Sequence, residues 1–179
     1  MKIALLRHAR VYFKEPLFST AATYIRNRIL YDISRIDPTT TRVSRAQYPE
    51  CYVSSMCRAR TTAAIVYDGT PSIWPELSEV ENTPVGFPNW FLPTTIRKVI
   101  SRVAWFFNYR KMVETRSESM ARARDVVYAL LHDHADTLLV THGFFMRCLQ
   151  HELHKSGFRG SIGFSPRNAE LYVFESADA

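Results

Sequence analysis

The chain has 179 residues, of which 46% are hydrophobic and 22% charged, and this size and composition predict one folded domain rather than a disordered chain. No apolar run approaches the roughly 20 residues needed to cross a bilayer and no signal-peptide pattern is visible, so we expect a cytoplasmic protein without a transmembrane segment. The formal net charge is +6, but the basic residues form no long run, and we expect no nucleic-acid partner.

Short apolar or β-branched segments alternate with helical patterns along the chain. The predicted strands cover residues 2–6, 51–54, 72–74, 137–141 and 171–174. The predicted helices cover residues 20–36, 61–67, 94–109, about 117–132 and a segment that follows Gly143. This alternation indicates an α/β fold, and we expect a three-layer sandwich with a mostly parallel central sheet flanked by helices.

Several of the predicted helices carry a stripe of apolar residues on one side. In the 20–36 helix the stripe is formed by Ile25, Ile29, Ile33 and Ile36. In the 94–109 helix it is formed by Ile96, Val99, Ile100, Val103, Phe106 and Phe107. Thr115 and Glu118 have the spacing of a capping box, which supports a helix start close to residue 117.

Residues 82–116 are expected to form a helical cap or lid over one end of the sheet, inserted within a single domain that spans residues 1–179. This segment opens with a proline-rich irregular loop. Its helix also has a basic side, around Arg97, Lys98 and Arg102. We expect that side to face solvent, with contact to a membrane surface as the less favoured alternative.

Polar side chains that suit phosphate chemistry follow three of the predicted strands. Arg7 and His8 follow the first strand, Arg58 follows the second, and His142 and Gly143 follow the fourth. Ligands of open α/β sheets bind beyond the carboxyl ends of the strands, so we expect these side chains to converge. Two arginines and two imidazoles around one small volume favour a tetrahedral dianion such as a phosphoryl group.

These residues lie in motifs that together resemble those of the histidine phosphatase superfamily, which has a phosphoglycerate mutase-like fold. The motifs read LRHA at 6–9, SSMCRARTTA at 54–63 and VTHG at 140–143. Their order and spacing match across about residues 2–175. Two positions depart from the family pattern, since Ala9 stands where glycine is usual and Thr61 where glutamine is usual.

The resemblance implies a metal-independent phosphatase, without a cofactor, that hydrolyses a small phosphorylated substrate. His8 would be the nucleophile and would form a transient phosphohistidine. Arg7, Arg58 and His142 would hold the phosphoryl oxygens, and the backbone amides after Gly143, at the start of a helix, would point at the same oxygens.

The leaving oxygen needs a proton, and the family often supplies it from a glutamate that follows the third strand. Glu79, in the sequence Leu77-Ser78-Glu79, has this context and is the predicted general acid. Glu81 and Glu76 are close enough in sequence to be rivals for the role.

Three alternatives stay open beside this hypothesis. The first is a phosphohistidine phosphatase that acts on protein, and the second, ranked low because such enzymes are usually longer, is a mutase. The third is a non-catalytic module that binds a phosphorylated ligand, which Ala9 and the ambiguous acid keep open. The sequence carries no signal for oligomeric state.

The cysteines support neither a metal site nor cysteine-based phosphatase chemistry. Cys51, Cys57 and Cys148 have no paired or zinc-type spacing and are expected to be free thiols. Cysteine phosphatases need an arginine six positions after the cysteine, whereas Cys51 lies seven before Arg58.

Overall fold

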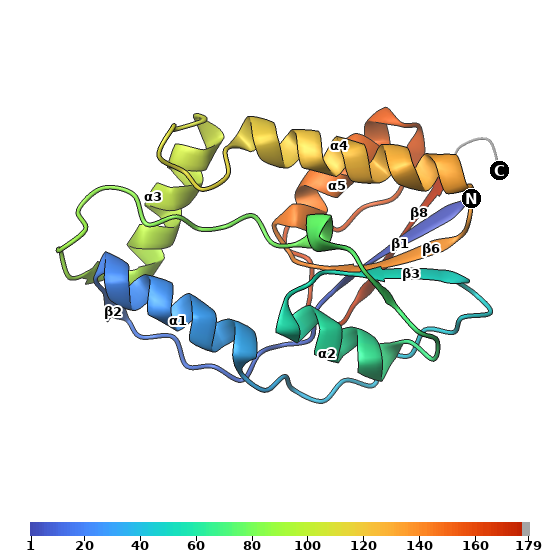
Figure 1. The fold of residues 1–179 in the computed structure, drawn as a ribbon, viewed down its shortest axis with the longest axis horizontal. Coiled ribbons are helices and arrows are strands. Elements are labelled where there is room, and N and C mark those ends of the chain that lie inside the picture. The colour runs from blue at the N-terminus through green and yellow to red at the C-terminus, as the bar shows by residue number, and fades with distance from the viewer. Residues whose placement is uncertain (177–179) are drawn as a thin grey trace.

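A mixed sheet forms the centre of the computed structural model, which describes residues 1–176 (Figure 1). The sheet has six strands in the order β4-β3-β6-β1-β8-β7. The strands are β1 (Lys2–Arg7), β3 (Glu50–Val53), β4 (Ser72–Ile73), β6 (Thr137–Thr141), β7 (Phe158–Arg159) and β8 (Leu171–Ser176). The first four are parallel to one another, and β8 and β7 add an antiparallel edge beside β1.

Helices cover both faces of this sheet, so the three-layer α/β prediction is confirmed. The helices are α1 (Ala21–Ile33), α2 (Cys57–Val66), α3 (Thr94–Phe106), α4 (Arg116–Asp133) and α5 (Phe145–Lys155), and a short 3₁₀ helix covers Pro75–Leu77. In Figure 1, α4 and α5 lie over one face of the sheet and α2 over the other. In residues 1–176, no helix has the length and apolar character needed to span a bilayer.

The alternation of side chains along β1 builds the two halves of the core. Ile3 and Leu5 pack with the residues of α4 and α5, whereas Ala4 and Leu6 pack with Ala63 and other residues of α2. All four β1 residues are fully buried, which is why the strand reads as a continuous apolar run rather than as an alternating one.

Two helix starts show how local sequence sets the boundaries. The predicted capping box is present, because the Thr115 side chain accepts from the Glu118 amide and the Glu118 carboxylate accepts from the Thr115 amide. The start of α2 was predicted at residue 61, but the helix begins at Cys57. The earlier start places Arg58 in the first helical turn rather than in a loop.

Beyond the carboxyl ends of the parallel strands, α1 and α3 form a separate layer with a small two-stranded sheet (Figure 1). Its strands, β2 (Phe18–Ser19) and β5 (Leu92–Pro93), pair in antiparallel fashion and join the 82–116 segment to the chain before α1. Strands of two residues give no periodic signal, and the sequence did not predict them.

The apolar stripe of α1 is exposed to solvent. Ile25, Ile29 and Ile33 are 49%, 60% and 65% exposed, and Tyr24 is the helix's buried residue. The apolar side of α3 is exposed as well. Arg97, which was expected on a solvent-facing basic side, is instead buried, so that expectation is wrong.

Candidate active site

A cleft of about 280 Å³ opens beyond β1, between the central sheet and the layer of α1 and α3. Several elements contribute to its walls: the ends of β1 and α1, the first turn of α2, the loop after residue 77, and α3. The lining residues are Arg7, His8, Phe13, Glu15, Asn27, Arg28, Tyr31, Arg58, Glu79, Asn82 and Lys98. The sequence-predicted residues Arg7, His8, Arg58 and Glu79 are therefore brought together.

The orientation of the His8 ring is fixed from both sides. Its Nδ1 lies 2.8 Å from the carbonyl oxygen of Ala9, and since a carbonyl can only accept, Nδ1 carries the proton. Arg58 Nε donates to His8 Nε2 over 3.3 Å. Both contacts select the tautomer with a lone pair on Nε2, and the backbone is held where His8 N donates to Thr141 O at 3.0 Å.

The surroundings keep this imidazole neutral. Burial, then the positive charge of Arg58, and to a smaller extent that of Arg7, lower the pKa of His8 to about 3, against a weaker opposing effect of the Ala9 carbonyl. Burial, again with Arg58 and with His8 itself, lowers the pKa of His142 well below its ordinary value. At neutral pH the two rings therefore add no positive charge, and the cations of the site are arginines.

Arg58 is anchored by groups on α1. Its Nη1 donates to Asp32 Oδ1 at 2.7 Å, and its guanidinium carbon lies 5.2 Å from the centre of the Tyr31 ring. The arginine side chain is 3% exposed and the Asp32 side chain 26%, so the ion pair is shielded from water mainly on the arginine side. The contact explains how a buried cation is tolerated beside His8 when no anion is bound.

Arg7 lies across Gly143, and the glycine makes room for it. Arg7 Nη1 donates to the Pro166 carbonyl at 2.7 Å, while its buried Nε has no partner among the described residues. A Cβ at Gly143 would lie 3.0 Å from that Nε and 3.2 Å from Cζ. A side chain at position 143 would therefore require the guanidinium to shift by a few tenths of an ångström.

His142 stands beside His8, with ring centres 5.1 Å apart. Its Nε2 is 2.8 Å from Ser54 Oγ, and its buried Nδ1 has no partner among the described residues. Ser54 follows β3, so three strand ends meet at this point as the sequence predicts. Buried polar atoms are normally paired, and unpaired atoms on Arg7 and His142 are what a site for an anion would leave.

Glu79 is held by backbone amides at the start of α5. Its Oε1 accepts from Phe145 N at 3.0 Å and from Val80 N at 3.0 Å, and Oε2 accepts from Phe144 N at 3.3 Å. The amides that follow Gly143 were expected to point at phosphoryl oxygens. In the structure they are engaged by Glu79 instead, because a carboxylate placed at a helix N-terminus is itself a suitable anion.

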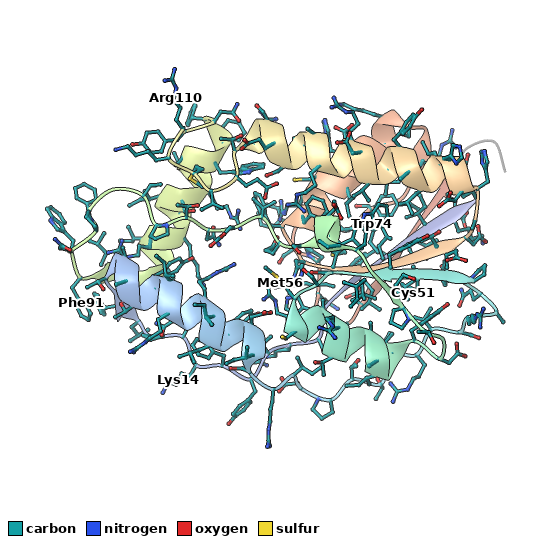
Figure 2. The ribbon with its side chains drawn as sticks, in the orientation of Figure 1. Lys14, Cys51, Met56, Trp74, Phe91 and Arg110 are labelled. Carbon is teal, nitrogen blue, oxygen red and sulfur yellow. The ribbon has the colours of Figure 1, made fainter. Side chains whose placement is uncertain are left out.

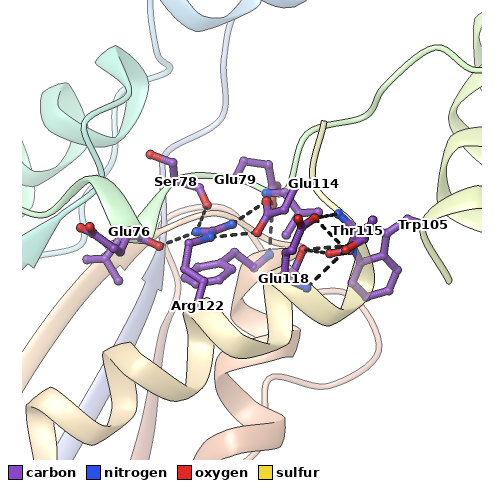
Figure 3. A network of polar contacts seen from close by, with 12 residues as sticks. Glu76, Ser78, Glu79, Trp105, Glu114, Thr115, Glu118 and Arg122 are labelled. Atoms are coloured by element: carbon purple, nitrogen blue, oxygen red, sulfur yellow. Dashed lines mark hydrogen bonds and ion pairs between the residues drawn. The ribbon is translucent and has the colours of Figure 1, made fainter. Parts of the chain in front are cut away.

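Arg122 of α4 fixes the loop that carries Glu79 (Figure 3). Its Nη1 donates to the carbonyl oxygens of Glu76 and Ser78, the latter at 2.9 Å. Its Nε and Nη2 each donate to the Glu114 carboxylate at 2.9 Å. The guanidinium also lies over the Phe145 ring, 3.9 Å from its centre. The loop and the start of α5 are thus joined by one side chain.

The rival acids are not in the cleft. Glu81 is exposed, and Glu76 is exposed with only its carbonyl bound by Arg122, whereas Glu79 lines the same walls as His8. Arg10 also turns away from the cleft, toward Asp37 at 3.7 Å, with a side chain that is 81% exposed.

Ala9 fits its position without strain. The residue is 1% exposed, and its amide donates to Thr62 Oγ1 at 2.9 Å. The non-glycine residues with positive φ in the described chain are Phe87, Asn108, His134 and Ala169, so Ala9 does not need the conformation that glycine favours.

Some residues of the site had no individual signal in the sequence. Asn27, Arg28 and Tyr31 of α1 reach the cleft from the side of the helix opposite the isoleucine stripe, and that periodicity was the available clue. Asn168 was also missed; its Nδ2 donates to the His8 carbonyl at 2.7 Å. Among residues 1–176, no group of three or more His, Cys, Asp or Glu side chains could hold a metal ion.

The sheet order and the pair of histidines beyond β1 and β6 define an α/β protein of the phosphoglycerate mutase-like fold. A family model described as histidine phosphatase superfamily (branch 1) matches residues 36–179. The chain belongs to that superfamily. The matched range begins after His8, so the position of His8 is known from the structure rather than from the family model.

Solved structures of the same fold cover nearly the whole chain. A mycobacterial glucosyl-3-phosphoglycerate phosphatase is 15% identical, with a TM-score of 0.57 over 96% of this chain and 91% of its own. A phosphoserine phosphatase from Entamoeba histolytica, in complex with 3-phosphoglyceric acid, is 12% identical, with a TM-score of 0.56 over 97% and 90%. The product of an open reading frame of Mycobacterium tuberculosis is 17% identical, with a TM-score of 0.59 over 96% and 89%. At these identities the likeness shows the fold. No curated protein matches the chain significantly.

Proposed function

We propose that the protein hydrolyses small phosphomonoesters through a covalent phosphohistidine on His8. The observation that carries this proposal is the fixed tautomer of His8, with Nδ1 bound by the Ala9 carbonyl and the Nε2 lone pair on the side of Arg58. A neutral, oriented imidazole in a cationic cleft has the properties that a nucleophile toward a phosphoryl group needs.

In the first step, Arg58 Nε moves its hydrogen bond from His8 Nε2 to a phosphoryl oxygen, and the freed Nε2 lone pair bonds to phosphorus. The ester P–O bond breaks at the same time, and the leaving oxygen takes a proton from the protonated form of Glu79. Arg7, Arg58 and the unpaired Nδ1 of His142 hold the phosphoryl oxygens and offset the charge that develops there. The carboxylate left on Glu79 is stabilised by the amides of Phe144 and Phe145.

In the second step, a water molecule attacks phosphorus and gives its proton to the Glu79 carboxylate. The N–P bond breaks, and inorganic phosphate and a free His8 result. One water is consumed for each ester hydrolysed, and Glu79 returns to its protonated form. No step needs an oxidant, a reductant or a second substrate.

The walls of the cleft favour a small acidic substrate. Besides the residues that hold the phosphoryl group, the cleft presents the guanidinium of Arg28, the amide of Asn27 and the ion pair of Lys98 with Glu15. A volume of about 280 Å³ is at the lower end for small-molecule sites. The relatives are consistent with this, because the compounds in their names, phosphoserine and 3-phosphoglyceric acid, are small phosphorylated acids.

The experiment measures hydrolysis of p-nitrophenyl phosphate between pH 5 and 8, with and without EDTA. We expect turnover by the parent protein in EDTA and an acid-labile phosphoenzyme after acid quench with labelled substrate. Both should be absent in His8→Ala and present in His132→Ala, a change at an exposed histidine. Absence of turnover by the parent would instead favour a module that only binds a phosphorylated ligand.

Two further outcomes decide between enzyme classes. Turnover abolished by EDTA would contradict the metal-independent reaction. Faster release of phosphate from a phosphohistidine peptide than from any small phosphorylated acid would favour a protein phosphohistidine phosphatase over the small-molecule enzyme.

A further inference from the structure

Helix α3 is oriented with its apolar side outward. Val99, Val103, Phe106 and Phe107 are 61%, 51%, 54% and 75% exposed, and they line a shallow depression of about 360 Å³ together with the stems of Lys98 and Arg102. A helix of a water-soluble domain normally buries such a stripe. Exposed apolar patches of this kind mark interaction surfaces.

The orientation is fixed by the polar residues on the inner side of the helix. Buried Arg97 donates through Nε to Ser19 O at 3.1 Å and through Nη2 to Trp90 O at 2.6 Å. Thr94 Oγ1 donates to the Pro16 carbonyl at 2.7 Å. A rotation of α3 that buried its apolar side would leave these carbonyls and the buried guanidinium without hydrogen-bond partners. These contacts therefore hold the apolar side of α3 toward solvent.

Exposed aromatic side chains are also present at the free end of the same layer. Phe18 and Phe91 stack with ring centres 5.5 Å apart, and Phe87 and Trp90 lie 4.5 Å apart. These four rings are 46% to 70% exposed. Figure 2 shows Phe91 at the end of the molecule farthest from the central sheet. We call these four rings and the exposed apolar residues of α3 the lid face.

The charge around the lid face selects among its potential partners. Residues 84–113 contain five Lys or Arg and no Asp or Glu, and the whole chain carries +6. Of the five, Arg97 is buried, Lys98 pairs with Glu15 and Arg102 lies over the Phe144 ring, which leaves two exposed cations. Arg110 and Lys111, just after α3, are exposed, and the Arg116 guanidinium lies 5.0 Å from the centre of the Phe106 ring. Two copies of this chain that paired through the lid face would bring these cations together, whereas an anionic surface would attract them.

We infer that the lid face docks the protein onto an anionic lipid surface. Trp90 and the phenylalanines would enter the headgroup region, where amphipathic and aromatic side chains are stabilised, and the cations beside them would contact lipid phosphates. The protein would lie on such a membrane and not span it. The inference does not depend on the reaction proposed for the cleft, because its test measures binding.

The test is co-sedimentation of the full chain with vesicles of phosphatidylcholine, either pure or mixed with phosphatidylglycerol. We expect binding to the mixed vesicles, little binding to the neutral ones, and a loss of affinity as salt is raised. Equal binding to both vesicle types, or to neither, would overturn the inference.

Variants locate the contact. Val103→Glu with Phe107→Glu should weaken binding by about tenfold or more, whereas Tyr128→Glu, at a residue of α4 that is 75% exposed, should not. Because the changed side chains are exposed, circular dichroism should show both proteins folded. Arg110→Glu with Lys111→Glu should also weaken binding by about tenfold or more, against Arg124→Glu as the matched control, whose side chain is 68% exposed.

Light scattering of the parent protein without lipid tests whether a second copy of the chain binds the lid face instead. A dimer that is lost in the Val103→Glu, Phe107→Glu variant would assign the lid face to a second copy of the chain and overturn the lipid assignment. A monomer supports it.

Discussion

At the scale of single residues, the neutral state of His8 links the chemistry of the site to the stability of the fold. Its pKa in the folded chain is about 3, against 6.5 for an ordinary histidine, because it is buried beside Arg58. Below about pH 6.5 the unfolded chain binds this proton and the folded chain does not. The free energy of unfolding should therefore fall as the pH falls from about 6.5 toward 3.

The His8→Asn variant tests this linkage. It removes the histidine that the unfolded chain protonates in this window, so the slope of unfolding free energy against pH should decrease by up to about 1.4 kcal/mol per pH unit. Urea denaturation at several pH values measures the slope, and His132→Asn at an exposed position is the control. An unchanged slope in His8→Asn would contradict the lowered pKa.

Glu79 is the general acid of the proposed reaction, so the effect of its removal should depend on the leaving group. Glu79→Gln keeps a side chain of the same shape but cannot give a proton, so esters of poor leaving groups should be hydrolysed about 10²–10⁴-fold more slowly. The effect on p-nitrophenyl phosphate should be much smaller, because its leaving group needs no proton. Steady-state kinetics on both ester types measure the difference. The same pattern in Glu81→Gln, and not in Glu79→Gln, would reassign the acid.

At the scale of secondary structure, Arg122 determines where Glu79 stands. It ties α4 to the carbonyls on either side of Leu77 and pairs with Glu114, and both side chains of that pair are at most 20% exposed. Removal of Arg122 leaves the Ser78 carbonyl and the Glu114 carboxylate, both partly buried, without this donor. We assign it as a positioning residue, because it acts on the reaction through Glu79 and the loop.

The prediction for Arg122→Met has two parts. The unfolding free energy should decrease by about 2–3 kcal/mol, since partly buried hydrogen-bonded charges lose their partner. Esters of poor leaving groups should also slow more than p-nitrophenyl phosphate, which a purely structural role would not cause. Urea denaturation and the two-substrate assay measure these effects, and exposed Arg124→Met is the control. Equal slowing of both ester types would contradict the positioning role.

At the scale of the whole molecule, an anion in the cleft should stabilise the folded chain. Arg7 Nε is a buried donor without a partner among the described residues, and the unpartnered Nδ1 of His142 belongs to a ring 5.1 Å from that of His8. Phosphate bound beside His8 would satisfy the Arg7 donor. A ligand that binds only the folded state raises its stability by about 2.7 kcal/mol at a concentration of 100 times Kd.

Thermal unfolding in inorganic phosphate tests this expectation. The Tm of the parent protein should rise by several degrees relative to chloride at equal ionic strength. In Arg58→Met the rise should be absent, whereas the exposed Arg60→Met, on the same helix, should keep it. A rise of equal size in both variants would place the anion elsewhere.

The central sheet and the gathering of the candidate site residues at one of its edges could be predicted from the sequence, because the signals for them are local. Buried parallel strands such as β1 and β6 read as continuous apolar runs, and the polar residues directly after them, His8 and His142, must then share one edge of the sheet. The capping box of α4 is local in the same sense. For these features the prediction and the structure agree, because the residues that form them are neighbours in the sequence.

Only the tertiary structure decided which sides of α1 and α3 face water and which group occupies the start of α5. An apolar stripe shows that a helix has an apolar side, but not whether the chain has another element to cover it. Within residues 1–176, Ile29 and Val103 are left exposed. The amides after Gly143 donate to Glu79, whose loop is held in place by Arg122 of α4. Such contacts join residues far apart in the chain, and their energies depend on distances that no local pattern contains.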